Sequence, residues 1–333
     1  MNPAYAGYSE DYSVGFNSRF QWSRVPGTFM TNTAHVNAGC PQNRLGFALM
    51  FVDQVEGEGY LHTVNGSGQI SVNLDGRFGS GFGNKLYGKK YIISAGLHFG
   101  VSQKYLDWSK LTFSDQYTPY TEGVQGPTLV RPQNESSNPY VDIGAGVRTR
   151  MMISRKESFL SFGAAIFHIN RPVETFFSIE NKLQPRYTAH FFSHFQLNKY
   201  TNNPDYLSIG MIHDRQQGLV TNTFTVEKDI YSIAMFGMSF RRQNFLLIDR
   251  NVDALVFHTL FSYWSWTIGY SYDVTVSDLG LHNTFGTHEI SLTYVFQGRN
   301  ICSGKGRKNK KADSCFELDL KRVKQKDFTI WKP

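Results

Sequence analysis

The chain has 333 residues, a formal net charge of +7, 30 Gly and 15% aromatic residues, among them 18 Tyr and 27 Phe. It contains no run of about 18 apolar residues, which excludes membrane-spanning helices. An ordinary cytosolic enzyme uses more Leu, Ala, Glu and Lys, whereas many aromatics and glycines suit a β-protein whose short strands carry aromatic girdles.

The positive charge is concentrated at the C-terminus. Residues 299–333 contain eleven Lys/Arg and four Asp/Glu, whereas the first 298 residues contain 23 basic and 23 acidic groups and are neutral. This balance argues against a general nucleic-acid-binding protein. Lys308, Lys310 and Lys311 in this basic tail could bind acidic partner surfaces or anionic lipid headgroups, and the alternative is a solvated extension.

Three cysteines, Cys40, Cys302 and Cys315, are too few for a disulfide framework and do not have metal-ligand spacing. In an oxidising compartment Cys302 and Cys315 could form a disulfide that closes a loop in the tail, and the alternative is two free thiols. Cys40 lies in a predicted turn and has no obvious mate.

The dominant pattern of the chain is the alternation of apolar and polar residues at every second position. In residues 11–22, five of six positions of one parity are apolar, and the other parity has no large apolar residue. The same alternation begins again at Tyr91, at Trp264 and at His288. One apolar and one small polar face are typical of strands with lipid outside and a polar lumen inside.

Less regular strands are predicted between these segments, which gives about fourteen in total. They are placed near residues 28–38, 44–54, 59–73, 139–151, 158–169, 186–198, 205–214, 218–228, 230–242 and 251–263. Each is long enough to cross a bilayer at a tilt, and a soluble β-sandwich or lipocalin rarely needs so many long amphipathic strands. We therefore predict an all-β, transmembrane antiparallel β-barrel.

The barrel is expected to span residues 11–297, preceded by an N-terminal strap or plug (1–10) and followed by the basic tail (298–333). An even number of strands places both termini on one side, which in bacterial barrels is the periplasm. The connections after odd strands, including the longest at residues 103–138, should then be extracellular. The Gly-rich stretch 75–88 is long for a periplasmic turn.

Residues that would indicate catalysis or metal binding are not arranged in any pattern that we recognise. His190 and His194 are the only histidines four residues apart, but in a strand they lie about 13 Å apart and cannot share one metal ion. No nucleophile elbow, phosphate-binding loop or metalloprotease helix occurs. We therefore predict neither an enzyme nor a cofactor.

Several motifs resemble the PorP/SprF family of Bacteroidetes. They run in order from residue 2 to about 297: Asn2-Pro-Ala-Tyr-Ala-Gly7, Arg19-Phe-Gln-Trp22, Tyr105-Leu-Asp-Trp-Ser-Lys-Leu-Thr-Phe-Ser-Asp-Gln116, Ile268-Gly-Tyr-Ser-Tyr-Asp-Val-Thr-Val-Ser277 and Thr287-His-Glu-Ile-Ser-Leu292. The chain differs from the family in lacking the short segment that usually precedes Asn-Pro-Ala-Tyr, and in continuing well beyond the last strand.

The resemblance implies an outer-membrane component of the type IX secretion system in a Gram-negative bacterium. One implied role is a translocon subunit that contacts periplasmic ring or lipoprotein components. The other is a partner that holds the C-terminal domain of a secreted adhesin at the cell surface, often for gliding. The competing hypothesis is a passive channel or hydrophobic-solute transporter. A secretory signal is absent from Met1 onward, and we infer that it was removed, trimmed or left out when the gene was defined.

Two segments carry the candidate partner-binding residues. Asn2, Pro3, Tyr5 and Gly7 precede the first strand, at the periplasmic rim or inside the lumen, where they could dock a partner, plug the barrel or merely close the first strand. The second segment lies in the long outer loop and contributes Leu106, Trp108, Leu111 and Phe113. Exposed apolar residues often mark interfaces, but we expect this loop to fold inward over the lumen.

Overall fold

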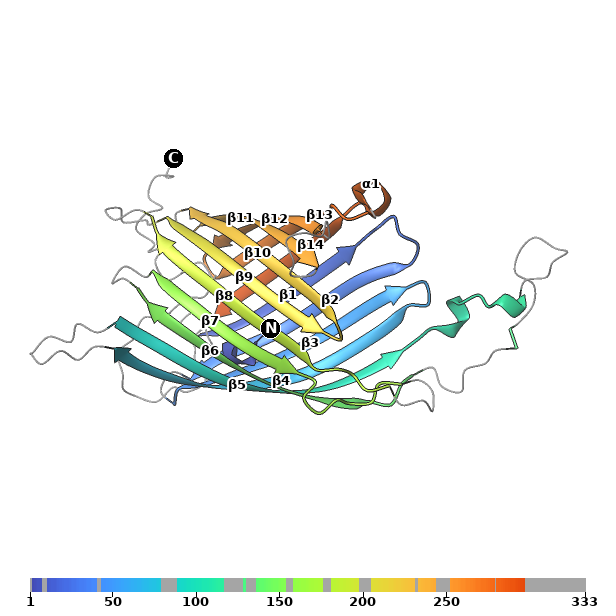
Figure 1. The fold of residues 1–333 in the computed structure, drawn as a ribbon, viewed down its shortest axis with the longest axis horizontal. Helices are drawn as coiled ribbons and strands as arrows, with labels where there is room; N and C mark the ends of the chain where they lie inside the picture. Colours follow the sequence, from blue (N-terminus) through green and yellow to red (C-terminus); the bar gives the residue numbers. More distant parts are fainter. Residues whose placement is uncertain are drawn as a thin grey trace, which may run out of the picture.

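The computed structural model is a closed barrel of fourteen antiparallel strands (Figure 1). It describes residues 2–7, 11–40, 43–78, 89–116, 128–129, 136–153, 158–175, 181–197, 205–230, 233–243, 252–278 and 280–296. The predicted fold class and the number of strands are confirmed. Among the described residues, no helix is both long and apolar enough to cross a bilayer.

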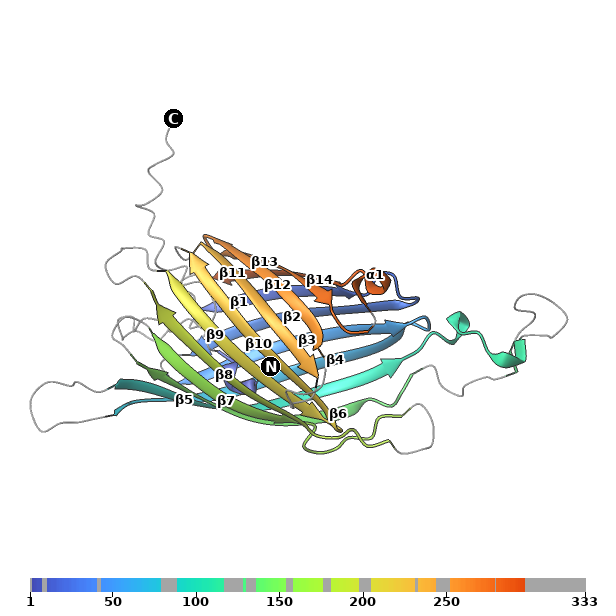
Figure 2. The same cartoon turned by 45° about the horizontal axis from the view of Figure 1, so that its top comes forward.

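The fourteen strands follow one another around the wall in chain order, so each hydrogen-bonds to its neighbours in sequence (Figure 2). They are β1 (Tyr12–Gln21), β2 (Thr28–Cys40), β3 (Leu45–Gly57), β4 (Leu61–Phe78), β5 (Lys89–Tyr105), β6 (Tyr140–Met152), β7 (Phe159–Phe167), β8 (Arg186–Gln196), β9 (Tyr206–Gln216), β10 (Leu219–Ile230), β11 (Ala234–Gln243), β12 (Val252–Tyr263), β13 (Trp266–Thr275) and β14 (Thr287–Phe296). Short helices are η1 (Pro3–Tyr5), η2 (Trp108–Lys110), η3 (Ser114–Gln116) and α1 (Gly280–Thr284).

Closure is made by β1 and β14, which pair from Tyr12 opposite Phe296 to Gln21 opposite Thr287. We call the end of the barrel with Tyr12 and Phe296 the terminal mouth. The opposite end, which carries the connection between β5 and β6 and the helix α1, is the loop mouth. The longest connection thus lies at the end of the barrel opposite the start of β1 and the end of β14, as the even number of strands predicted.

The strand boundaries agree with the prediction to within a few residues, except in the hairpin of β4 and β5. β4 continues to Phe78 and β5 begins at Lys89. The Gly-rich stretch 75–88 is therefore partly strand, and its residues 79–88 lie outside the described residues.

Burial in this barrel is the reverse of that in a soluble protein. The outward positions are apolar and exposed, as Leu49 (65%) and Phe16 (50%) illustrate. The inward positions are small or polar and buried, as Ser94 (0%) and His98 (3%) illustrate. Since exposed apolar walls are stable only in contact with lipid, the alternation read from the sequence describes a membrane barrel.

Candidate functional site: the lumen and its N-terminal segment

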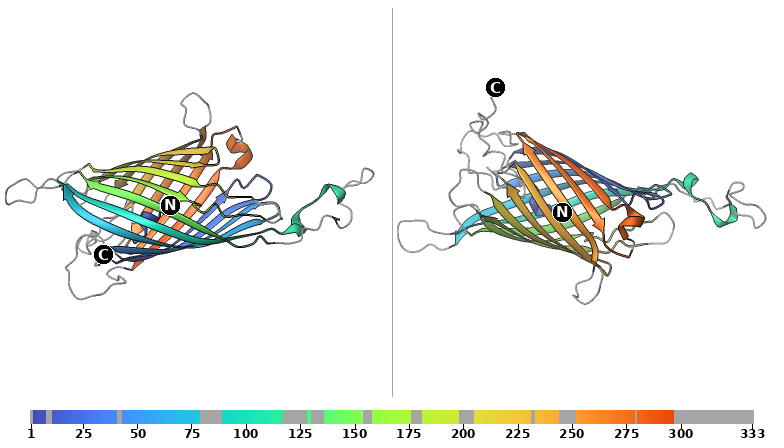
Figure 3. Two further views of the ribbon diagram at one scale, coloured as in Figure 1. Left: turned by 60° about the horizontal axis from the view of Figure 1, so that its bottom comes forward. Right: turned by 90° about the horizontal axis from the view of Figure 1, so that it is seen from above.

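Residues Asn2–Gly7, here called the N-terminal segment, lie inside the barrel rather than at its rim. The N-terminus is seen within the outline of the barrel in every view (Figure 3). Asn2 is 3% exposed and Ala4 is 1% exposed, which is deeper burial than most wall residues reach. The η1 turn within the segment contacts β4, β5 and β6.

A row of small residues on the inner wall receives this segment. Its members face one another across six neighbouring strands, each directly opposite the next in the ladder. This small-residue row consists of Gly39, Gly46, Ser71, Gly96, Gly146 and Ala165.

The glycines of the small-residue row are required by close approach of the two backbones. A methyl group on Gly46 would overlap the carbonyl group of Ala6, and one on Gly96 would overlap the carbonyl group of Pro3. Backbone atoms cannot move aside as a flexible side chain can, so any larger residue at these positions excludes the segment.

Asn2 anchors the start of the segment through all of its side-chain groups. Its Nδ2 donates to the carbonyl oxygens of Val147 (2.9 Å) and Ala164 (3.1 Å), and its Oδ1 accepts from the backbone N–H of Ala4 (2.9 Å). The amide thus links β6 to β7 and also caps the η1 turn. Pro3, directly after the cap, has the fixed φ that suits the first position of a helical turn.

The other end of the segment is bound by β4 and β2, the strands on either side of β3. The Ser71 hydroxyl on β4 donates to the carbonyl oxygen of Ala6 (2.6 Å), and the N–H of Gly7 donates to Asn37 Oδ1 on β2 (2.6 Å). Gly7 has φ +62°, a left-handed conformation that glycine adopts without strain. The segment is therefore held along its whole length.

Tyr5 extends to β8, the strand next to β7 in the wall. Its hydroxyl forms a hydrogen bond of 3.0 Å with His190 Nε2 on β8. The guanidinium carbon of Arg148 lies 4.5 Å from the centre of the Tyr5 ring, within the range of a cation–π contact. Arg148 is itself 2% exposed and donates to the Ser94 hydroxyl (3.2 Å).

Several lumenal histidines lie directly opposite a glycine on the neighbouring strand. The pairs are His35 with Gly15, His98 with Gly144, His190 with Gly163 and His258 with Gly237. The imidazole ring covers the glycine in three of these pairs, where a methyl group would overlap the ring. Glycine thus makes room for aromatic rings in a lumen of limited width.

A cluster of charged side chains fills the other side of the lumen, towards the loop mouth. The Asp273 carboxylate on β13, 3% exposed as a side chain, accepts from Arg19 on β1 (2.8 Å) and from Arg241 on β11 (3.0 Å). Arg19 also pairs with Glu289 on β14 (3.1 Å), and Arg241 with Asp253 on β12 (2.5 Å). This ionic cluster joins the closing strands β14 and β1 to β11–β13.

The segment of the long loop at residues 106–116 projects away from the barrel in every view, beyond the loop mouth (Figures 1 to 3). Our expectation that it folds inward over the lumen is therefore wrong for this part of the loop. The physical reason is visible at Gly59 in the β3–β4 turn. A methyl group on Gly59 would meet Leu106 and Leu111, so these leucines bury apolar surface against the outer turn instead of the lumen.

The aromatic residues of this loop segment pack against each other. The rings of Trp108 and Phe113 are stacked with centroids 6.3 Å apart. Asp107 accepts hydrogen bonds from the N–H (3.0 Å) and the hydroxyl (2.5 Å) of Ser109, and these bonds lower the pKa of the Asp107 carboxyl. The segment is therefore ordered by its own local contacts.

Residues 1–294 match the family described as type IX secretion system membrane protein PorP/SprF. The chain belongs to this family. No protein with a curated description matches the sequence. As a PorP/SprF protein with an apolar barrel wall, it is an outer-membrane component of the type IX secretion system.

Solved structures that are similar to this PorP/SprF barrel include outer-membrane proteins of several organisms. The Acinetobacter baumannii outer membrane protein Omp33 is 10% identical, with 87% of this chain and 100% of that chain covered and a TM-score of 0.42. The Ralstonia pickettii toluene transporter TbuX is 8% identical, with 89% and 92% covered and a TM-score of 0.44.

The basic tail of this PorP/SprF chain, with Lys308, Lys310 and Lys311, lies outside the described residues, as do Cys302 and Cys315. Cys40, predicted to lie in a turn without a mate, is instead the last residue of β2 and is disulfide-bonded.

Proposed function

We propose that this PorP/SprF chain binds a secreted surface protein at its loop mouth, while the N-terminal segment closes the lumen. In this proposal both termini face the periplasm, where the terminal mouth and the basic tail contact ring or lipoprotein components of the secretion system. The observation that supports the proposal is the binding of the N-terminal segment to the small-residue row.

The N-terminal segment suits closure better than partner capture. Asn2, Tyr5 and the backbone groups of Ala6 and Gly7 are all bound by the barrel wall. A partner would have to break these hydrogen bonds before it could use the same groups, and an unsatisfied buried polar group costs roughly 1–3 kcal/mol. We infer that the segment is a fixed plug of the barrel.

The loop segment 106–116 is the element best placed to meet a partner. It extends beyond the barrel at the loop mouth and combines the stacked pair Trp108 and Phe113 with charged neighbours. Aromatic side chains that project from a rigid scaffold are typical anchors of protein interfaces. With the termini in the periplasm, this segment lies at the cell surface, where a secreted adhesin would be held.

A passive channel or hydrophobic-solute transporter is the competing function. It needs a route past the N-terminal segment, Arg148 and the ionic cluster, all of which occupy the lumen. Residues of the segment are bound to both β4 and β8, which are four strands apart along the wall. This favours docking over free diffusion.

The experiment is a pull-down from the native organism with the full chain, followed by mass spectrometry of the bound proteins. The proposal predicts recovery of a secreted surface protein by the natural sequence and its loss with Trp108→Ala. The matched control is Thr112→Ala in the same loop segment, which should retain the partner because Thr112 is exposed and polar. Equal recovery by all three chains would contradict docking on this segment, and recovery of no partner together with ion conductance would favour the channel.

A further inference from the structure

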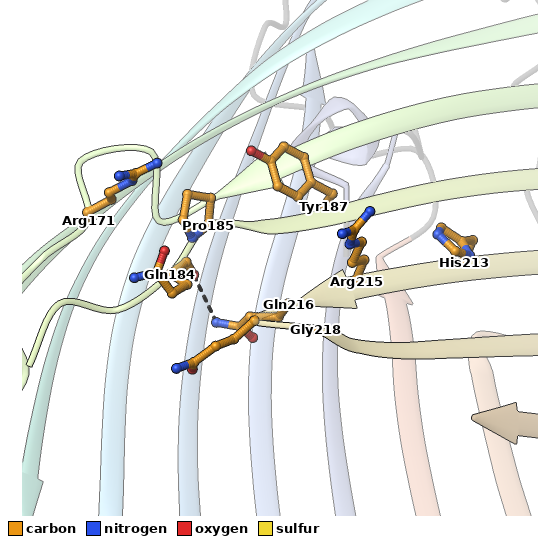
Figure 4. Close-up of a pocket in the computed structure, with 9 residues that line it drawn as sticks. Arg171, Gln184, Pro185, Tyr187, His213, Arg215, Gln216 and Gly218 are labelled. Carbon is orange, nitrogen blue, oxygen red and sulfur yellow. Dashed lines mark hydrogen bonds between the residues drawn. The ribbon is translucent and has the colours of Figure 1, made fainter. Parts of the chain in front are cut away.

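A pocket of about 600 Å³ opens at the loop-mouth end of β8 and β9, between Arg171, Tyr187 and Arg215 (Figure 4). Its rim is formed by the end of the β7–β8 connection and by the β9–β10 turn. That turn has φ +48° at Gln217 and +86° at Gly218, and Gln216 Nε2 donates to the carbonyl oxygen of Gln184 (3.1 Å). The pocket is therefore framed by a tight turn and a fixed loop.

The pocket lies on the lipid side of the wall and not in the lumen. Tyr187 stands directly opposite Arg215 in the ladder and is 52% exposed. The next residues along the two strands, Thr188 and Asp214, face the lumen and hydrogen-bond to each other (2.5 Å). Because side chains alternate along a strand, Tyr187, His213 and Arg215 point outward.

The apolar band of the wall ends just below this pocket. Met211, Phe224 and Phe240 face one another on β9, β10 and β11 as a lipid-facing row. Two residues nearer the loop mouth, the corresponding row is polar and basic: it consists of His213, Asn222 and Arg242. Such a change from apolar to basic side chains marks the depth at which lipid headgroups begin.

The basic side chains that line the pocket favour binding of an anion. Its lining contains Arg171, Arg215 and His213 but no Asp or Glu. Among the residues that the structure describes, neither Arg171 nor Arg215 forms an ion pair. Guanidinium groups bind phosphate with two parallel hydrogen bonds, which makes arginine the preferred residue for phosphate recognition.

We propose that this pocket binds the phosphate group of an anionic membrane lipid in the leaflet at the loop mouth. The headgroup phosphate lies between Arg171 and Arg215 beside the Tyr187 hydroxyl. The acyl chains lie along the apolar band below, over Ile209 and Met211. This position, at the edge of the apolar band, favours a lipid over a soluble phosphate, because only a lipid uses both surfaces.

The test compares lipid retention by the purified full chain. The barrel is reconstituted in phosphatidylcholine vesicles that also contain lipid A or phosphatidylglycerol, and co-purifying lipid is counted by native mass spectrometry after mild extraction. The double variant Arg171→Gln/Arg215→Gln should lose anionic lipid at least about tenfold, since two charge-assisted contacts are removed. The matched control is Arg24→Gln, at the same mouth on another part of the rim, where Arg24 lies over the Phe285 ring.

Three outcomes decide the proposal. Loss of anionic lipid by the double variant, with retention by the Arg24→Gln control, supports it, and the preferred lipid identifies the headgroup. Equal retention by all chains overturns it. Displacement of the lipid from the natural chain by millimolar inorganic phosphate also overturns it, because the site would then be one for soluble anions. If the double variant does not give the heat-modifiable migration of a folded barrel, Arg171→Lys/Arg215→Lys tests the same contacts and should bind more weakly than the natural chain.

Discussion

The two sides of the lumen are built from different chemistry. On β2–β7 the inner wall carries a row of glycine, serine and alanine that binds the backbone of the N-terminal segment, with Arg148 beside the Tyr5 ring. On β11–β14 and β1 the inner wall carries Asp273, Arg19, Arg241 and their partners, which bind one another. One side therefore depends on shape and the other on charge.

The difference has consequences for tolerance to substitution. Shape complementarity between two backbones leaves no space for a side chain, so a single added methyl group breaks it. An ionic cluster depends on balanced charge, so it tolerates changes of size better than the loss of one carboxylate. Substitutions in the small-residue row should therefore release the N-terminal segment, whereas substitutions in the ionic cluster should make the barrel less stable.

The largest expected effect is at Gly46. Gly46→Val should expel the N-terminal segment from the small-residue row while the barrel still forms, because the added side chain overlaps Ala6. Hydrogen exchange of the peptide that contains residues 2–7 should rise from protected to the rate of an unstructured chain. Gly66→Val is the control: Gly66 is exposed on β4 with open space around it, so protection should be unchanged.

Asp273→Asn should give the next largest effect, on the stability of the barrel. It leaves Arg19 and Arg241 without their shared carboxylate, and the loss of one partner of a buried ion pair costs about 3 kcal/mol or more. A urea titration should show a lower unfolding midpoint. The control is Asp75→Asn, because the Asp75–Arg44 pair is much more exposed and its loss should cost less than ~1 kcal/mol. Equal midpoints for the two variants would contradict the role of the ionic cluster.

Asn2→Ala should weaken the binding of the N-terminal segment to the barrel wall without abolishing it. The substitution removes two hydrogen bonds to the wall and the cap of the η1 turn, a loss of roughly 1–3 kcal/mol. Exchange of residues 3–7 should become faster than in the natural chain and slower than in Gly46→Val. Unchanged protection would show that Asn2 does not anchor the segment.

The smallest expected effect is that of Tyr5→Phe. It removes the hydrogen bond to His190 and keeps the ring beside Arg148, so segment binding should weaken by about 1 kcal/mol. Tyr5→Ala, which also removes the contact with Arg148, should weaken it more. The same hydrogen-exchange measurement ranks the two variants, and equal effects would contradict the contribution of the ring.

The strands of the barrel wall could be predicted from the sequence, whereas the binding of the N-terminal segment to the small-residue row could not. Strict alternation, as in residues 11–22, fixes which face of a strand meets lipid, so strand positions and the fold class followed from one local pattern. The small-residue row could not be seen, because Gly46, Gly96 and Gly146 become neighbours only when the register of three hairpins is known. The small polar face of β5 was its only visible sign.

The loop segment shows a second limit of sequence-based prediction. Its apolar residues indicate that some surface covers them, but the sequence does not say which surface. Leu106 and Leu111 pack at Gly59, a turn glycine some fifty residues earlier whose missing side chain makes the space. Contacts of this kind depend on tertiary structure and leave no local pattern.

Closure of the lumen by the N-terminal segment can be measured as the electrical conductance of the full chain in planar lipid bilayers, compared with a variant that lacks residues 2–7. A barrel whose lumen is closed by the N-terminal segment should be insulating as the full chain and should conduct ions steadily after the deletion. Equal, stable conductance of the two proteins would contradict closure of the lumen by this segment.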